Sequence, residues 1–399
     1  MKKIFAFLAI AALAACNNPL SPDSGTTGVE NVPKAPQGGE VFLTVAAGAP
    51  STKVASQSEV NEKTIWNVQV FVFRAGGGAD DGVLEIAKSE GVFDPVVPSA
   101  GDAPLSNTGG YDGITVKCST GYREVWVVCN DSKDHTKGAD AIMNKAEFLA
   151  LTHNLENSSP SKFLMIGRSN PDSDSPVVNL TEGASRVNVP VHRLAACIVL
   201  EDVENDMLSP AYQKQGVFRL DAAYLLNVPG WIDYGEISSA TDDPSPFDKW
   251  YAKLAPEISG NRAAILYDKI GGAAGSVVEY GTHYSTPHTF YAYRNDCVPS
   301  QTATFAPRST VLVLEASIKY KTSTGVDSWM TVYYPVTIAT VNADGTLQKG
   351  IQANKKYHVT LKVNRPGSTD PNIPVTFHDL TPNITVSDWI DGDTYSPVI

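Results

Sequence analysis

Short apolar runs separated by turn residues recur along the chain from about residue 40 onwards. In residues 66–73, Val68, Val70 and Val72 fall on one side of an extended chain and Phe71 and Phe73 on the other, which predicts a strand. In residues 357–363 apolar and polar positions alternate, a pattern typical of a strand that covers a core on one side only. Further strands are expected at residues 41–45, 187–191, 195–203, 224–228, 310–320, 330–338 and 383–390.

Three segments give more specific local predictions. Residues 114–118 and 124–129 are strand-like and flank the turn residues 119–121, so we expect them to form a hairpin. Residues 139–151 are the best helix candidate in the first half, because Ile142 and Phe148 can share a face. Residues 229–281 are expected to form loops with short helices.

The N-terminus has the parts of an export signal. Lys2 and Lys3 precede an apolar stretch, residues 4–12, that is too short to span a bilayer as a mature helix. Small residues then lead to Cys16, an arrangement that resembles the lipobox of bacterial lipoproteins. We therefore expect a signal peptide at residues 1–15 and a lipid on Cys16 that tethers the exported precursor to a membrane. The alternative is an ordinary secretory signal with a chance cysteine.

Composition narrows the architecture and the partners. The chain has 399 residues and is 42% hydrophobic, which is enough for sizeable cores and for two domains. Only 19% of residues are charged, and 31 Gly and 26 Pro favour strands and loops over helical bundles. The net charge of −12 argues against nucleic acid as a partner. We expect a tether at residues 16–39, a β-sandwich domain at 40–193 and a second one at 194–399.

The cysteines do not suggest a chemical site. After Cys16, the chain has Cys118, Cys129, Cys197 and Cys297, none of them in a C-x-x-C pair, so a zinc site or thioredoxin-like motif is not expected. Cys129 and Cys197 lie in apolar runs and are expected to be buried as small hydrophobic side chains.

Catalytic motifs are also missing from the sequence, so we expect no enzymatic activity, no catalytic residue, no cofactor and no metal. The spacing of His283 and His288 suits neither a helix face nor one face of a strand. An aromatic group could form a sugar-stacking platform, although packing is the preferred interpretation. Its members are Trp231, Tyr234, Trp250 and Tyr251.

A set of segments in a fixed order, starting at Cys16, resembles one known family. They are residues 41–45, 68–73, 121–130, 163–165, 192–198, 354–357, 367–371 and 386–389. Over most of its length after Cys16 the chain resembles the fimbrillin family of Bacteroidales, the subunits of type V pili. The resemblance implies two tandem transthyretin-like β-sandwich domains, few helices, and a structural role in adhesive fimbriae on the cell surface.

The resemblance also implies an assembly mechanism. A trypsin-like protease cuts the lipidated precursor after its first strand, and a C-terminal strand of another subunit fills the groove that this strand leaves. In this chain the cut is expected between Lys53 and Val54, although the best-characterised members are cut after Arg and the first Arg here is Arg74. The removable strand would contain Val41, Phe42, Leu43 and Val45.

The donor segment is expected at residues 383–399. Ile384, Val386 and Ile390 would fill pockets, and Trp389 would be an anchor on the opposite face. Partners would then be copies of this chain, other pilus subunits, the processing protease and a surface receptor. The alternatives are an anchor subunit that stays lipidated and uncut, and a surface lipoprotein that binds glycans through Trp231 and Trp250.

Overall fold

The computed structural model describes most of the chain beyond residue 39, and these residues belong to one compact unit. The expected signal peptide and tether, with Cys16, lie outside the described residues, and so do Lys53, Val54 and Ile390. The described ranges are 40–48, 62–93, 101–108, 110–171, 175–235, 250–251, 261–295, 309–341, 347–371, 373 and 380–389.

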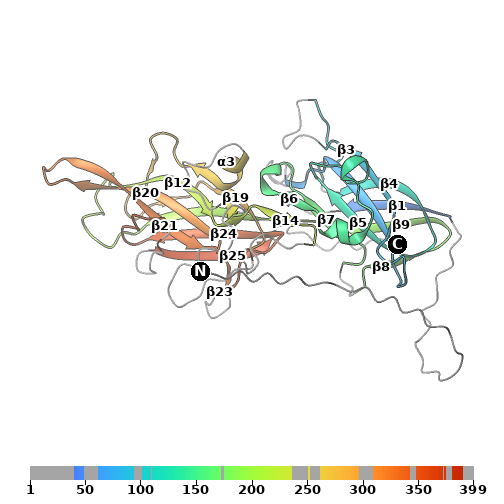
Figure 1. Cartoon of the computed structure of the whole chain (residues 1–399). Helices are drawn as coiled ribbons and strands as arrows, with labels where there is room; N and C mark the ends of the chain where they lie inside the picture. The colour runs from blue at the N-terminus through green and yellow to red at the C-terminus, as the bar shows by residue number, and fades with distance from the viewer. Residues whose placement is uncertain are drawn as a thin grey trace, which may run out of the picture. The chain divides into compact units, whose positions relative to one another are not determined.

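The fold is mainly β, as the sequence predicted, and its strands form two sets (Figure 1). The first set contains two sheets. One has the order β4 (Gly110–Ser119), β1 (Glu40–Gly48) and β9 (Gly183–Pro190). The other has the order β10 (His192–Arg193), β7 (Met165–Arg168), β5 (Gly121–Cys129), β2 (Asn67–Arg74) and β3 (Leu84–Gly91), with β8 (Val177–Leu180) paired to β5.

Strand β2 shows why these two sheets pack as a sandwich. Val68, Val70 and Val72 are buried in a core shared with β1 and β4, whereas Phe71 and Phe73 are buried in a second core on the opposite face. The six-stranded sheet is thus covered on both faces, and the alternation predicted for residues 66–73 is confirmed. Burial of each such side chain contributes about 1.5–3 kcal/mol.

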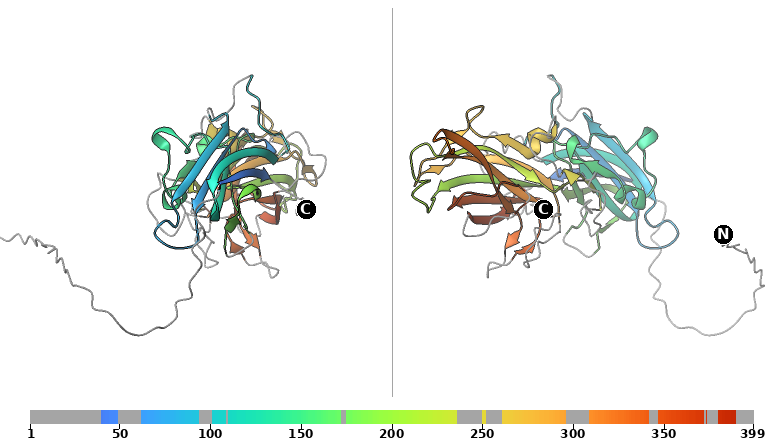
Figure 2. Two further views of the ribbon diagram at one scale, coloured as in Figure 1. Left: turned by 90° about the vertical axis from the view of Figure 1, so that its right-hand side faces the viewer. Right: turned by 60° about the vertical axis from the view of Figure 1, so that its left-hand side comes forward.

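The second set also contains two main sheets, whose red, orange and yellow-green strands can be followed in Figure 2. Its large core holds the inward side chains of β24, including Tyr357, Val359 and Leu361, which confirms their predicted one-sided alternation. One sheet has the order β18 (His283–Tyr284), β11 (Ala195–Asn205), β24 (Lys355–Val363) and β25 (Leu380–Asp388), with β19 (His288–Tyr293) paired to β11. The other has the order β16 (Tyr267–Lys269), β12 (Phe218–Leu226), β20 (Val311–Lys321) and β21 (Asp327–Thr337), with β17 (Ser276–Val277) paired to β12.

Short elements complete the described part of the chain. The small sheets pair β13 (Val228–Pro229) with β15 (Trp250–Tyr251), β14 (Trp231–Asp233) with β6 (Thr152–Asn154), and β22 (Thr340–Val341) with β23 (Leu347–Lys349). The helices are α2 (Lys145–Leu149), α3 (Asn261–Leu266), and the 3₁₀ turns η1 (Gly138–Asp140) and η2 (Leu155–Asn157). None of the described helices is long and apolar enough to cross a membrane.

The predicted hairpin at residues 114–129 is wrong. Strands β4 and β5 are consecutive but belong to different sheets, so the turn at Thr120 and Gly121 carries the chain across the sandwich. Gly121 has φ +117°, a conformation that favours glycine. Val116 on β4 and Val127 on β5 share one core from opposite sides, which gives the same alternation as a hairpin.

The helix predicted at residues 139–151 is much shorter. The Asn144 side chain accepts a hydrogen bond from the Glu147 backbone N–H at 2.9 Å and so caps the N-terminus of α2. Residues 141–143 lack helical structure, and η1 occupies residues 138–140. The chain passes from the first set of strands to the second at Leu194, between β10 and β11. The division into domains 40–193 and 194–399 stays a prediction.

Candidate functional site

Strand β1 is the middle strand of its sheet. It pairs antiparallel with β4, from Glu40 opposite Ser119 to Gly48 opposite Gly110, and parallel with β9, from Val41 opposite Gly183 to Gly48 opposite Pro190. Figure 1 shows β1 between these two neighbours. Because both edges of β1 are paired, its removal would leave unpaired backbone donors and acceptors on β4 and β9.

The inward side chains of β1 complete the core of the first sandwich. Leu43, Val45 and Ala47 are 0%, 1% and 3% exposed, whereas Phe42 points outward and is 52% exposed. Loss of β1 would therefore open an apolar groove at positions 43, 45 and 47. Of the residues predicted for the removable strand, Val41 lies in β1, Leu43 and Val45 line the core, and Phe42 does not. The strand is longer than predicted and includes Ala47.

The chain leaves β1 at Gly48 and next enters the described residues at Glu62. The expected cut between Lys53 and Val54 lies in the intervening segment, outside the described residues. Arg74 is the last residue of β2, and its Nη1 lies 3.3 Å from Asp80 Oδ2. The first arginine of the chain is thus part of a paired strand rather than of the segment that follows β1.

Strand β25 lies at the edge of its sheet. Among the described strands, its neighbour is β24, with Val386 opposite Tyr357 and Ile384 opposite Val359. Leu380 at its start is 1% exposed, Ile384 is half-buried, and Val386 is 36% exposed. A strand that is paired on one side and covered less towards its end can detach with fewer broken contacts than a central strand.

Trp389 follows β25 directly and is held in a buried cluster. Its ring is 7% exposed and stacks on Tyr291 of β19, with ring centroids 5.6 Å apart and an interplanar angle of 20°. Phe163 packs against both rings, at 4.5 Å from Tyr291 and 5.6 Å from Trp389. The end of the candidate donor strand is therefore fixed by aromatic packing.

Glu62 joins this cluster through both its side chain and its backbone. One carboxylate oxygen accepts a hydrogen bond from Trp389 Nε1 at 2.8 Å, and the other accepts one from the Tyr291 hydroxyl at 2.9 Å. The Glu62 carbonyl oxygen accepts hydrogen bonds from Nε of Arg193, at 3.0 Å, and from its Nη2. The first described residue after β1 is thus bonded to the last described residue of the chain.

Arg193 is the remaining member of the cluster, and it is 1% exposed. Its guanidinium carbon lies 4.7 Å from the centroid of the Trp389 ring, a cation–π distance. Burial lowers the pKa of Arg193 to about 10, against the opposing charge of Glu62, so the group remains protonated at neutral pH. A buried cation of this kind depends on its partners, because leaving it unpaired costs about 3–5 kcal/mol.

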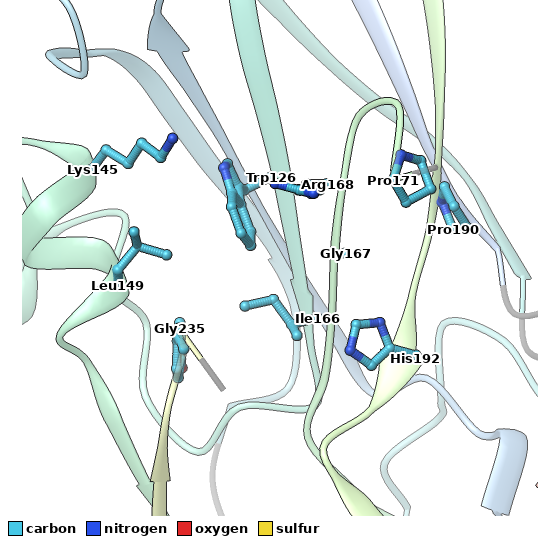
Figure 3. A pocket seen from close by; sticks show the side chains of 11 residues that line it. Trp126, Lys145, Leu149, Ile166, Gly167, Arg168, Pro171, Pro190, His192 and Gly235 are labelled. Atoms are coloured by element: carbon cyan, nitrogen blue, oxygen red, sulfur yellow. The ribbon is translucent and has the colours of Figure 1, made fainter. Parts of the chain in front are cut away.

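A pocket of about 410 Å³ lies on the other face of the six-stranded sheet from β1 (Figure 3). Lys145 from α2, Trp126 from β5 and Arg168 from β7 line it. The Glu124 carboxylate accepts hydrogen bonds from Trp126 Nε1 at 2.8 Å and from Lys145 Nζ at 2.6 Å. The charge of Lys145 is thus balanced within the pocket wall.

The histidines singled out in the sequence have separate carboxylate partners. Nδ1 of His283 lies 2.8 Å from Asp202, and Nδ1 of His288 lies 2.6 Å from Asp268. Within the described residues, no group of three or more His, Cys, Asp or Glu side chains could hold a metal ion.

Three cysteines and one member of the aromatic group, Tyr234, are buried in the described part of the chain. Cys118, Cys129 and Cys197 are buried free thiols, and burial raises the pKa of Cys129 so that its thiol stays protonated. Tyr234 is 1% exposed and donates a hydrogen bond to Asp131, in agreement with a packing role.

Comparisons with known proteins bear on this arrangement. Residues 41–171 match the family of the major fimbrial subunit protein (FimA). A "putative cell adhesion protein" from Parabacteroides distasonis has a TM-score of 0.58 and 18% sequence identity, with 88% of this chain and 100% of that chain covered. A fimbrilin from Porphyromonas gingivalis has a TM-score of 0.53 and 17% identity, with 88% of this chain and 99% of that chain covered.

A second "putative cell adhesion protein", from Bacteroides eggerthii, has a TM-score of 0.53 and 19% identity, with 90% of this chain and 98% of that chain covered. None of the curated proteins matches the sequence. At these identities the structural likeness shows the fold. The match to the FimA family and the shared fold together confirm the resemblance of this chain to the fimbrillin family and support a role in fimbriae or cell adhesion.

Proposed function

We propose that this protein is a shaft subunit of an adhesive cell-surface fimbrium and that it polymerises by exchange of strands between subunits. The observation that carries the proposal is the position of β1, a central strand that fills the core of the first sandwich and precedes the expected processing segment. After a cut between Lys53 and Val54, β1 is held by non-covalent contacts alone. Its departure exposes a groove that binds a strand of another subunit.

The donor in this proposal is residues 383–399, which begin within β25. In β25, Ile384 and Val386 lie two positions apart, the same spacing as Leu43 and Val45 in β1. Such a strand can place apolar side chains in the groove and satisfy the backbone of β4 and β9. Because the donor strand and the groove are different surfaces, the contact is head-to-tail and extends into a filament.

The precursor reaches the outer membrane through a lipid on Cys16 and is released into the fimbrium by the cut. A trypsin-like protease accepts Lys53, whose charge pairs with a carboxylate in the substrate pocket of such enzymes. Residues 1–15 are removed earlier as a signal peptide. The partners of the mature protein are copies of itself and other pilus subunits.

Limited proteolysis tests this function. Purified precursor is treated with trypsin, the new N-terminus is sequenced, and the products are run on a denaturing gel without boiling. We expect a start at Val54 and a ladder of oligomers. A precursor that resists cutting at Lys53 and stays monomeric would contradict the shaft assignment and favour an uncut, lipidated anchor subunit.

A further inference from the structure

The cluster around Glu62 connects three segments of the chain, and one of them, the candidate donor strand, must leave the cluster in strand exchange. Glu62 follows the processing segment, Arg193 lies where the chain passes between the two sets of strands, and Trp389 ends the candidate donor. These residues lie far apart in the sequence. Their contacts therefore tie the end of the candidate donor strand to two residues that stay in the subunit.

We propose that this cluster is a latch that holds β25 in its own subunit and so opposes its donation to another subunit. The proposal rests on the strand-exchange function above and adds a control on the donor. Glu62 is held by the hydrogen bonds from Arg193 to its carbonyl oxygen, and three residues further on the backbone of Ile65 pairs with Ser106. Held in this way, the Glu62 carboxylate keeps Trp389 in place.

Departure of β25 from a latched subunit is costly. Removal of Trp389 breaks the hydrogen bond to Glu62 and uncovers one face of the Arg193 guanidinium. It also removes the ring that stacks on Tyr291 and packs edge-on against Phe163. A hydrogen bond to a charged group is among the stronger ones in a protein. A latched subunit therefore keeps its donor strand.

A variant that cannot be cut shows how readily a subunit donates its own strand, because its groove stays filled and cannot receive one. Lys53→Gln keeps β1 in its groove, so a Lys53→Gln subunit can act only as a donor. Fluorescently labelled Lys53→Gln subunits are mixed with trypsin-cut wild-type subunits, and the label that enters the ladder is measured. The same assay is run with the double variants Lys53→Gln/Glu62→Ala and Lys53→Gln/Lys63→Ala. Lys63 is the matched control, because it is the neighbour of Glu62 but lies outside the cluster.

We expect the Glu62→Ala double variant to enter the ladder about tenfold more than Lys53→Gln alone, since loss of a hydrogen bond to a charged group changes an equilibrium by about this factor or more. Amide hydrogen exchange in residues 380–389 should be faster in that variant, and the Lys63→Ala control should behave like Lys53→Gln. If Glu62→Ala unfolds the protein, Trp389→Phe in the Lys53→Gln background tests the same contact, because it keeps an aromatic ring but removes the indole donor.

Equal incorporation and equal exchange among the uncut variants would overturn the latch. If cut wild-type subunits form ladders in the same experiment, that result leaves strand exchange intact and rejects the latch alone. If cut wild-type subunits form no ladder, the proposed function itself fails. Exchange in residues 380–389 of the uncut variants still tests the cluster's hold on β25 in that case.

Discussion

Leu43 allows a test in which one substitution weakens the precursor but leaves the filament unchanged. The side chain is fully buried between β4 and the six-stranded sheet, in a core with Val70 and Val116. Leu43→Ala removes buried apolar atoms and leaves a cavity. Substitutions of this kind cost about 2–5 kcal/mol.

The measurement compares two states of the same variant. In uncut Lys53→Gln monomers, Leu43→Ala should lower the free energy of unfolding of the first sandwich by about 2–5 kcal/mol. Urea denaturation measures this change. Filaments assembled from trypsin-cut Leu43→Ala subunits should dissociate at the wild-type temperature, because residue 43 is no longer present. Phe42→Ala is the control, since its exposed side chain should cost less than about 1 kcal/mol in the monomer.

The refuting result is a filament that carries the defect. If Leu43→Ala filaments dissociate at a lower temperature than wild-type filaments, residue 43 still contributes to the filament and β1 remains in the polymer. Strand exchange at this groove would then be wrong. A monomer that loses no stability would instead contradict the packing of Leu43 in the core.

Three further predictions concern other parts of the structure. Lys53→Gln should block trypsin cleavage between residues 53 and 54 and the formation of ladders, whereas Lys63→Gln should leave both unchanged on the same gels. Deletion of residues 383–399 should give a monomer that is cut at Lys53 but forms no ladder, and polymerisation of this truncation would disprove the donor assignment. His135 is buried, which opposes its charge, but the hydrogen bond and charge of Asp131 outweigh burial and raise its pKa. Its contribution to stability is therefore complete below the ordinary histidine pKa of about 6.5 and is lost as the pH rises through the raised value. Urea midpoints measured across this range should fall with pH in the wild type and fall less in His135→Gln.

The sequence pattern was informative where one strand faces defined cores. In residues 66–73 the alternation of Val70 with Phe71 predicted a strand with two apolar faces, and the structure places these faces in two different cores. The periodicity of residues 357–363 likewise predicted the buried side of β24. Local alternation is sufficient in such cases because the backbone of a strand fixes the direction of every side chain.

The pattern was ambiguous where the partner of a strand had to be inferred. Val116 and Val127 alternate in the same way whether β4 and β5 pair in a hairpin or face each other across a sandwich. In the structure β4 pairs with β1, which is distant in the sequence, and β5 pairs with β2 and β7 in the other sheet. No local signal carries that information.

The candidate site was predicted in part. The importance of the first strand and of Trp389 came from a family resemblance, and the structure adds the central position of β1 and the edge position of β25. Glu62 was missed. It is a single carboxylate in a polar segment, and its contacts to Arg193 and Trp389 join residues that are distant in the sequence.

Strand exchange can be tested in the native fibre through the N-terminal residue of the subunit in filaments purified from cells. We predict that this residue is Val54, which means that β1 has left the subunit and that another strand occupies its place. A subunit that begins at a lipidated Cys16, or at any residue that keeps β1 attached, would contradict strand exchange at this groove.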